Sequence, residues 1–486
     1  MKIGSALVSL SPRRPRLVPL ELPSQSNPGR HGADGETRLI NCYPESAGRE
    51  GKIPLPLYAA DGLASFSTLT NGGACRGMLA TPTKLFVVSG RLLFGIDAAG
   101  GSTALGGIPG DGPVFMARNR ANPFEVAIAA DGLPFIVTNG NTLTAVSDPD
   151  LQPPTNLDFL DGYILYAVQN GRFYYSGIDD AGTIGANDYA EAEGSPDGLQ
   201  RLFVHNRTIF LLGEDSTELW DSTGDVTFPF QRSPGAFYEV GCLAPASVVS
   251  LGEGVAWVTD RGSVISARIG GGFQRISTHA VERSIDSLTN DQKSKIEGFV
   301  YERRGHEFYV LSGATFTWVY DLTTGMWHER MSYGESRWRA SYYAMFGGKH
   351  IVGDFENGVL YQIDPDTYTE AGEHLVVTMR VPVNAWPNCV RLNRLRIDAI
   401  PGVGLNTASL HNSDPQLMLK VSKNGGKSYG NEMTRPIGKI GQYMARTAFD
   451  KIGTSDEDGF VCEVSASAAV VRAFTGISSE ADIVRR

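Results

Sequence analysis

The chain has 486 residues, a net charge of −10, 42% hydrophobic residues and 20% charged residues. This composition is typical of a globular protein and excludes a largely disordered one. The length favours one large repeat-built domain with a smaller one beside it. The acidic balance argues against a protein that wraps nucleic acid, since such a protein needs a basic face. No window approaches the ~18 uninterrupted apolar residues of a membrane span, and the N-terminus has no apolar signal core.

The five cysteines are an odd number, widely spaced, without a Cys-x-x-Cys pair. This usage predicts reduced thiols, made in a cytoplasm, and no metal motif. They are Cys42, Cys75, Cys242, Cys389 and Cys462.

Residues 1–38 form a predicted N-terminal arm. Arg13, Arg14 and Arg16 stand in a Pro-rich stretch there and concentrate positive charge. The pattern indicates either a flexible basic arm or an arm that docks on a neighbouring subunit.

The main signal is a recurring hairpin of two apolar runs around a Gly- or Asp-containing turn. The 57 glycines, about 12% of the chain against the usual ~7%, suit many tight turns. The runs are rich in Val, Ile, Phe, Tyr, Thr and Trp, as β-strands are. Seven copies occur, at 85–97, 134–148, 163–179, 209–221, 255–268, 308–321 and 350–364.

The hairpin starts are mostly about 40–50 residues apart, the spacing of four-stranded propeller blades. We therefore predict an all-β fold with a β-propeller over residues 39–372, of six or seven blades with seven favoured. The interval from Pro134 to Tyr163 is only about 30 residues, which indicates an abbreviated blade or two merged registers. A ring needs an early strand to complete the last blade, and 39–44 or 52–58 would supply it.

One predicted blade resembles a kelch repeat, which supports the architecture and not a kelch function. The matching residues are Tyr320, Asp321, Thr324, Gly325 and Trp327, with Gly347-Gly348 as the glycine pair. A helix is predicted over 284–298, with Leu288 and Ile296 as its apolar positions.

The pattern changes near residues 370–380, and residues 373–486 predict a C-terminal β-sandwich. The predicted strands are separated by loops rich in Gly, Asn, Ser and Asp. They cover 375–383, 392–400, 417–422, 443–449 and 460–464.

Three short segments invite a chemical interpretation. Residues 422–429 resemble the Asp-box of sialidase-like propellers, but Asn424 and Tyr429 replace its Asp and Trp, so a plain turn is favoured. His328 and Glu329 alternate on a predicted strand and point to opposite faces, which favours a blade edge over acid–base catalysis. The carboxylates of 188–193 lack a calcium-loop pattern and suggest a solvated loop. We predict no catalytic, cofactor-binding or metal-ligating residues.

Several strings, taken in order, resemble the packaged-DNA stabilisation proteins, or tail-hub accessory factors, of short-tailed bacteriophages. The resemblance runs over nearly the whole chain, and its C-terminal end departs most, at Asn424, Tyr429 and 454–458. The strings are RLINCYPE (38–45), GACRGM (73–78), LDGY (160–163), GRFYYS (171–176), AEGSPD (192–197), STELW (216–220), FPFQR (228–232), EVGC (239–242), QRISTH (274–279), 320–330 and IGKIGQYMAR (437–446).

The resemblance implies a non-enzymatic virion protein of the phage tail, made in the host bacterial cytoplasm. It implies a homo-oligomeric ring, of six copies, below the portal–adaptor ring of the head-to-tail connector. Such a hub or nozzle closes the DNA channel after packaging and anchors the tail needle and the tailspike or fibre proteins. DNA would pass through the channel without being a specific ligand, and the assembled state would not involve a membrane.

Two alternatives remain at this point. A glycan-binding or glycan-cleaving, sialidase-like propeller would bring several arginines and a Tyr–Glu pair together at the propeller axis. A kelch-like intracellular adaptor would need more than one clear kelch blade.

Overall fold

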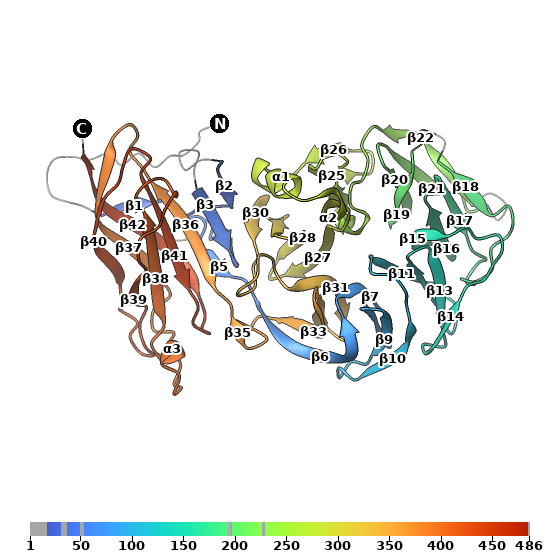
Figure 1. Cartoon of the computed structure of the whole chain (residues 1–486), viewed down its shortest axis with the longest axis horizontal. Coiled ribbons are helices and arrows are strands. Elements are labelled where there is room, and N and C mark those ends of the chain that lie inside the picture. The colour runs from blue at the N-terminus through green and yellow to red at the C-terminus, as the bar shows by residue number, and fades with distance from the viewer. Residues whose placement is uncertain are drawn as a thin grey trace.

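The computed structural model describes residues 17–30, 36–48, 53–192, 194, 197–225 and 229–484. Arg13, Arg14 and Arg16 of the predicted N-terminal arm lie outside these residues. Two β-rich parts lie side by side, a propeller and a sandwich, with both described ends of the chain at the sandwich side (Figure 1). None of the helices in the described part has the length and apolarity that crossing a membrane requires.

The propeller consists of four-stranded antiparallel units, of which the described residues form seven. The first four contain β7 (Cys75–Ala80), β8 (Leu85–Ser89), β9 (Leu92–Ile96), β10 (Ser102–Gly107); β11 (Val114–Arg118), β12 (Val126–Ala130), β13 (Leu133–Thr138), β14 (Thr142–Ala145); β15 (Pro154–Leu160), β16 (Tyr163–Val168), β17 (Arg172–Tyr175), β18 (Tyr189–Glu191); and β19 (Leu199–His205), β20 (Thr208–Gly213), β21 (Thr217–Ser222), β22 (Phe230–Tyr238).

The other three units complete the circle. They contain β23 (Val249–Leu251), β24 (Gly254–Val258), β25 (Val264–Arg268), β26 (Gly272–Arg275); β27 (Glu297–Arg303), β28 (His306–Ser312), β29 (Thr317–Asp321), β30 (Met326–Glu329); and β31 (Ala340–Phe346), β32 (Lys349–Asp354), β33 (Asn357–Asp364) with β6 (Gly62–Gly73). First strands of successive units contact one another, as β7 does β11 and β27 does β31, so these strands are innermost.

The hydrophobic core lies between neighbouring units. On β20, Ile209 and Leu211 pack towards the third unit, while Phe210 and Leu212 pack towards the fifth. Successive side chains of a strand point to opposite faces, so a strand between two units reads as a continuous apolar run. This is why the seven predicted hairpins stand out in the sequence, and all seven coincide with paired strands.

Tight turns join many of these strands. Asp161-Gly162 connects β15 to β16 and Gly347-Gly348 connects β31 to β32, and both residues of each turn have positive φ. Two-residue turns of this kind match the twist of paired strands, and glycine adopts them without strain.

Hairpin 134–148 joins the third and fourth strands of its unit, whereas the others join the second and third, so the short interval comes from merged registers, one of the two alternatives. Three other details of the propeller differ from the sequence predictions. The last unit is completed by β6, not by 39–44 or 52–58. The kelch-like residues lie on β29 and β30, but Gly347-Gly348 belongs to the next unit.

The predicted helix over 284–298 is the third difference in the propeller. The chain forms α1 (His279–Asp286) and α2 (Asn290–Ser294) instead, and β27 begins at Glu297. Thr289 caps the start of α2 in a capping box with Gln292, which ends any continuous helix there. Leu288 and Ile296 are buried, as predicted, in the core beneath the helices.

The sandwich has two sheets around a single apolar core. One contains β4 (Cys42–Pro44), β5 (Leu57–Ala59), β42 (Ala473–Val484), β37 (Cys389–Ala399) and β40 (Thr447–Thr454), with β1 (Val18–Leu20) paired to β42. The other contains β3 (Glu36–Ile40), β36 (Val377–Val383), β41 (Phe460–Ala466), β38 (Gln416–Ser422) and β39 (Met433–Pro436), with β2 (Asn27–Pro28) paired to β3. The short helix α3 (Leu410–Ser413) lies in a loop between them.

Strand pairing places the N-terminal segment in the sandwich. β3 pairs with β36, β4 pairs with β5, and β5 pairs with β42. The predicted domain limit at residue 39 therefore does not follow the sheets. The strand predicted at 443–449 begins at Thr447, and β42 was not predicted. The two parts are also not separate sheets, because Ile40 of β3 forms a parallel bridge with Glu329 of β30.

Candidate functional site: the propeller–sandwich junction

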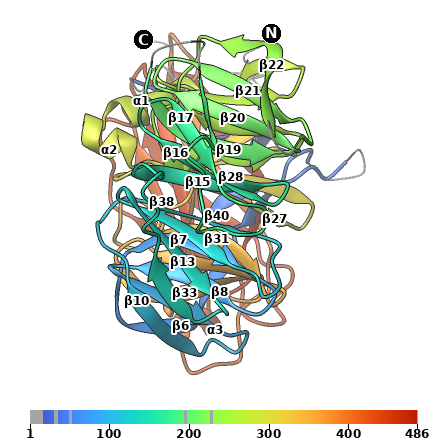
Figure 2. The same cartoon turned by 90° about the vertical axis from the view of Figure 1, so that its right-hand side faces the viewer.

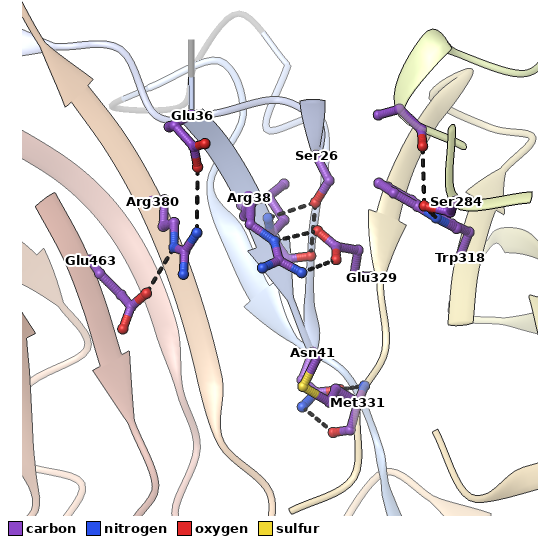
Figure 3. Close-up of polar contacts among 12 residues, drawn as sticks. Ser26, Glu36, Arg38, Asn41, Ser284, Trp318, Glu329, Met331, Arg380 and Glu463 are labelled. Atoms are coloured by element: carbon purple, nitrogen blue, oxygen red, sulfur yellow. Dashed lines mark hydrogen bonds and ion pairs between the residues drawn. The ribbon is translucent and has the colours of Figure 1, made fainter. Parts of the chain in front are cut away.

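The junction between the two parts is built on β3, which lies between β30 of the propeller and β36 of the sandwich (Figure 3). On its propeller side, Ser26 donates its backbone N–H to the Trp327 carbonyl at 2.8 Å. The Ser26 hydroxyl is in turn bonded to the backbone of Leu39, at 2.7 Å from its N–H. The N-terminal segment is therefore hydrogen-bonded to the propeller before it continues into the sandwich.

Charged side chains form a row across four strands at this junction. Arg38 makes a two-pronged ion pair with Glu329, with 2.9 Å between Nε and Oε1. Arg380 stands directly opposite Arg38 in the register and bonds to Glu463 at 2.7 Å and to Glu36 at 3.4 Å. Three carboxylates thus offset two guanidinium groups that would otherwise repel each other.

Burial alone lowers the pKa of Arg38, but the hydrogen bond and charge of Glu329 outweigh it and raise the pKa above the ordinary value. The pair is only 23% and 11% exposed. Partial burial makes such a pair costly to break, since either charge left alone stays partly desolvated.

Asn41 joins the two parts through its side chain. Its amide donates to the Met331 carbonyl at 2.8 Å and to the Val376 carbonyl at 2.9 Å, and it accepts the Met331 N–H at 3.0 Å. Its φ of 56° is a conformation that Asn tolerates better than most residues. Asn41 therefore fixes the end of β30 and the start of the sandwich to one point.

The linker between β33 and β36 is held from both sides. Arg472 donates to the carbonyls of Tyr368, at 3.1 Å, and Leu375. Burial lowers the pKa of Arg472 to about 10, still well above neutral pH. Glu370 accepts bonds from Ser332 at 2.6 Å and from Trp338 at 2.8 Å.

Glu370 also offsets a buried charge. Its Oε1 lies 3.6 Å from Arg330, whose guanidinium stacks 3.9 Å from the centre of the Trp338 ring. Burial raises the pKa of Glu370, and the charge of Arg330 opposes that rise. The linker is thus anchored to the propeller at Glu370 and to the sandwich at Leu375, while residues 371–374 between these points are exposed.

The sequence candidates for catalysis lie in this junction or in turns. His328 and Glu329 point to opposite faces, as predicted: His328 packs near Tyr43 and Phe308, while Glu329 pairs with Arg38. Burial lowers the pKa of His328 to about 3, so the ring is neutral at ordinary pH. Trp327 donates its indole N–H to the Ile276 carbonyl at 2.7 Å. These residues hold strands together.

The other two candidates are a turn and an edge strand. Ser422 Oγ accepts the Gly426 N–H at 2.8 Å, and Asn424 Oδ1 accepts the Ser428 N–H at 2.9 Å, which confirms the plain turn. The 188–193 group was predicted as a solvated loop, but Tyr189–Glu191 form the edge strand β18, where Glu191 pairs with Arg172 at 2.9 Å. Glu193 lies outside the described residues. Among the described residues, no group of three or more His, Cys, Asp or Glu side chains could hold a metal ion.

A cavity of about 460 Å³ opens at the inner strands β7, β11, β15 and β31. Its charged lining is Arg118 and Asp158. Burial raises the pKa of Asp158, and its oxygens already accept the N–H groups of Val204 and Phe159, both at 2.8 Å. One arginine and one occupied carboxyl group are not the arginines and Tyr–Glu pair of a sialidase-like site.

Two family models match successive parts of the chain. One, described as bacteriophage P22 Gp10, β-propeller, matches residues 51–368, and one described as bacteriophage P22 Gp10, β-sandwich, matches residues 377–477. The chain belongs to the bacteriophage P22 Gp10 family. This confirms the family resemblance and the fold class predicted from the sequence, and it makes the chain a structural protein of a bacteriophage.

Solved structures match the chain over part of its length. The computationally designed Ika8 protein is 14% identical, with a TM-score of 0.37, over 62% of this chain and 99% of that one. The WD40 β-propeller domain of Doa1 is 13% identical, with a TM-score of 0.40, over 62% and 96%. BamB from Moraxella catarrhalis is 13% identical, with a TM-score of 0.38, over 67% and 97%. No curated protein sequence matches the chain.

The sequence did not reveal the junction. The string 38–45 stood out as part of the family pattern, and it contains both Arg38 and Asn41. Its partners Glu329, Met331 and Val376 are about 290 to 335 residues further on, as the separations in these bonds show. A periodicity argument concerns neighbours along the chain and does not find such pairs.

Proposed function

We propose that this chain forms a ring, of six copies, in the tail of a short-tailed phage, below the portal–adaptor ring. There it closes the DNA channel after packaging and anchors the tail needle or nozzle and the tailspike or fibre proteins. It acts as a load-bearing part and not as an enzyme. The carrying observation is that Gp10-family propeller and sandwich models match in order over residues 51–368 and 377–477.

The junction supports a mechanical role. A part that holds a pressurised channel shut must transmit force between its contacts without bending between its domains. Here the connection is made by β3, by the Arg38–Glu329 pair and by the bonds of Arg472 to the linker, so neither domain moves freely. Domains joined by an exposed linker alone would move relative to each other.

The charge balance supports protein contacts over DNA contacts. A net charge of −10 disfavours tight DNA binding, which depends on Lys and Arg contacts to phosphates. An acidic channel wall would also keep DNA from sticking during its exit.

A virus lacking the gene tests the proposal directly. We expect capsids that package DNA and then lose it, and full retention when the protein is supplied in the host. Purified virions should contain the protein, found by mass spectrometry. Particles that hold their DNA and infect normally without the protein would contradict the proposal.

A further inference from the structure

A second cavity, of about 340 Å³, opens between the N-terminal segment and α1. α1 and β2 contact each other there, beside the propeller–sandwich junction (Figure 1), while Figure 2 views the molecule from the opposite, propeller end. We call this cavity the basic pocket, because its lining includes two arginines and a histidine and no acidic residue. The lining residues are Asn27, Gly29, Arg30, His279 and Arg283.

The two arginines of the basic pocket come from different walls and have no carboxylate partner. Arg283 of α1 donates to the Pro28 carbonyl, which holds its guanidinium group beside the N-terminal segment. Arg30 stands at the end of that segment and is exposed. Neither arginine forms an ion pair with an acidic residue in the described part of the chain. Their charges therefore remain available to a ligand that enters from solvent.

The acidic residues closest in the chain to Arg283 are already paired. Glu282 forms an ion pair with Arg275 at 2.6 Å, and Asp286 lies 3.8 Å from Lys293. The hydrogen bonds from Arg275 and Ser277 outweigh the effect of burial and lower the pKa of Glu282, so this carboxylate is charged and bonded to Arg275. These acids do not cancel the charge of the basic pocket.

Glu36, which stands opposite Pro28 in the strand register, also has a basic partner of its own. Its carboxylate accepts a bond from Arg380 at 3.4 Å, on the sandwich side of β3. The start of α1 adds to the positive potential, since His279 is the first residue of the helix and helix N-termini carry partial positive charge. The pocket is thus locally positive in a chain of net charge −10.

We propose that the basic pocket binds a phosphate group. Guanidinium groups match the geometry of phosphate and carboxylate oxygens. A phosphate offers more oxygens than a carboxylate, so Arg30 and Arg283 can each bond to it from their own wall. The source is the DNA backbone or free phosphate. Only the DNA source rests on the tail function proposed above, and a backbone contact carries no sequence information, which suits a channel that any sequence passes.

The first test titrates the full-length chain with sodium phosphate at constant ionic strength, by calorimetry and by thermal unfolding. A ligand that binds the folded state raises the unfolding midpoint. Arg30→Gln and Arg283→Gln should each weaken phosphate binding by about tenfold, since each removes a charge-assisted hydrogen bond. Arg283→Gln also loses the bond to Pro28, whereas Arg30→Gln changes an exposed side chain and leaves the fold intact.

The matched control is Arg261→Gln. Arg261 is 77% exposed in the turn between β24 and β25, so this change removes the same charge away from the pocket. The control should bind phosphate as the wild type does. Equal phosphate binding by the wild type and both pocket variants would overturn the proposal.

A second arm separates the sources of the phosphate group. Binding of a short DNA duplex is followed by fluorescence anisotropy, with free phosphate as competitor. If both pocket variants weaken duplex binding and phosphate competes with the duplex, the source is the DNA backbone. If the variants lose phosphate binding but bind the duplex as the wild type does, the source is free phosphate. Tighter binding of polyglutamate than of phosphate would assign the pocket to an acidic protein and overturn the proposal.

The outcomes also separate this proposal from the tail function. If the wild-type chain does not bind phosphate while a virus lacking the gene loses its DNA, the basic pocket fails and the tail function stands. If the chain binds phosphate through Arg30 and Arg283 while the deletion virus infects normally, the tail function fails and the phosphate site stands.

Discussion

Arg38 of β3 and Glu329 of β30 are 291 residues apart in the sequence and form a two-pronged ion pair at the junction of propeller and sandwich. The pair exists only when the N-terminal segment lies between the two parts. It therefore couples three regions of the chain: the beginning, the sixth propeller unit and, through β36, the sandwich. The contacts around it lead to specific expectations.

A double-mutant cycle should measure this coupling. Arg38→Ala and Glu329→Ala should each cost about 1–3 kcal/mol of unfolding free energy, because each leaves a partly buried charge unpaired. The double variant should cost less than the sum, with a coupling of about 1–2 kcal/mol. Urea unfolding followed by fluorescence gives the values.

The control is the pair Arg394 and Asp450, which also forms a short ion pair but is 46% and 50% exposed. Its cycle should give about 0.2–1 kcal/mol, the range of exposed pairs. Equal coupling energies for the two pairs would show that burial at the junction does not strengthen the Arg38–Glu329 pair.

Asn41 should be more sensitive than its size suggests. Asn41→Gly keeps access to the positive φ but removes three hydrogen bonds to backbone groups of both parts, so we expect a loss of about 2–4 kcal/mol. Asn41→Ala should cost more, since alanine disfavours this φ. Limited proteolysis should show new cleavage near the linker in both variants, and protection equal to wild type would contradict the junction role.

His306 should make stability depend on pH. Its Nδ1 lies 2.8 Å from Asp321, and its Nε2 lies 3.9 Å from Glu45. The hydrogen bond that His306 donates to Asp321 raises the pKa of His306 above 6.5, against the opposing effect of burial. For Asp321, burial raises the pKa, but the bond from His306 outweighs it and holds the pKa below 3.8.

The direction of the pH dependence of stability follows from these two pKa shifts. A raised histidine pKa stabilises the fold fully below about pH 6.5 and loses this effect as pH rises through the folded pKa. A lowered aspartate pKa stabilises above about pH 3.8 and loses its effect as pH falls through the folded pKa. His306→Gln should thus destabilise more at about pH 5.5 than at about pH 9. The exposed His279→Gln serves as control, and a pH-independent difference for His306→Gln would refute the charged pair.

The sequence predicted the propeller and most sandwich strands for a physical reason. Strands packed between two units, such as β20 and β24, are apolar on both faces and end at turns rich in Gly and Asp. Both signals are local, so they are visible without the structure. The two short helices were merged because Leu288 and Ile296 share a helical spacing, although the Thr289 cap separates them.

The junction was not predictable in this way. β1 and β5 pair with β42, and β3 pairs with β36 and β30, and none of those pairs has a local signature. The buried Arg330, Glu370 and Arg472 also look like ordinary surface residues in the sequence. Their burial depends on partners that only the fold supplies.

The five cysteines give a final test of the fold in solution. All five are buried and free of disulfides, and burial raises the pKa of Cys75, Cys242 and Cys462 to about 12. A thiol must be both accessible and ionised to react quickly, so the native chain should react very slowly with a thiol reagent such as DTNB.

Unfolding in urea should release all five thiols with the same midpoint as the loss of fluorescence, because they lie in the cores of both parts. Met444→Cys adds one thiol at a position that is 83% exposed and should react at once, which checks the assay. The cysteines also report on the unfolding of each part individually, because Cys75 and Cys242 lie in the propeller and Cys42 and Cys462 lie in the sandwich. Release of the sandwich thiols at lower urea than the propeller thiols would contradict the rigid coupling at Arg38 and Asn41.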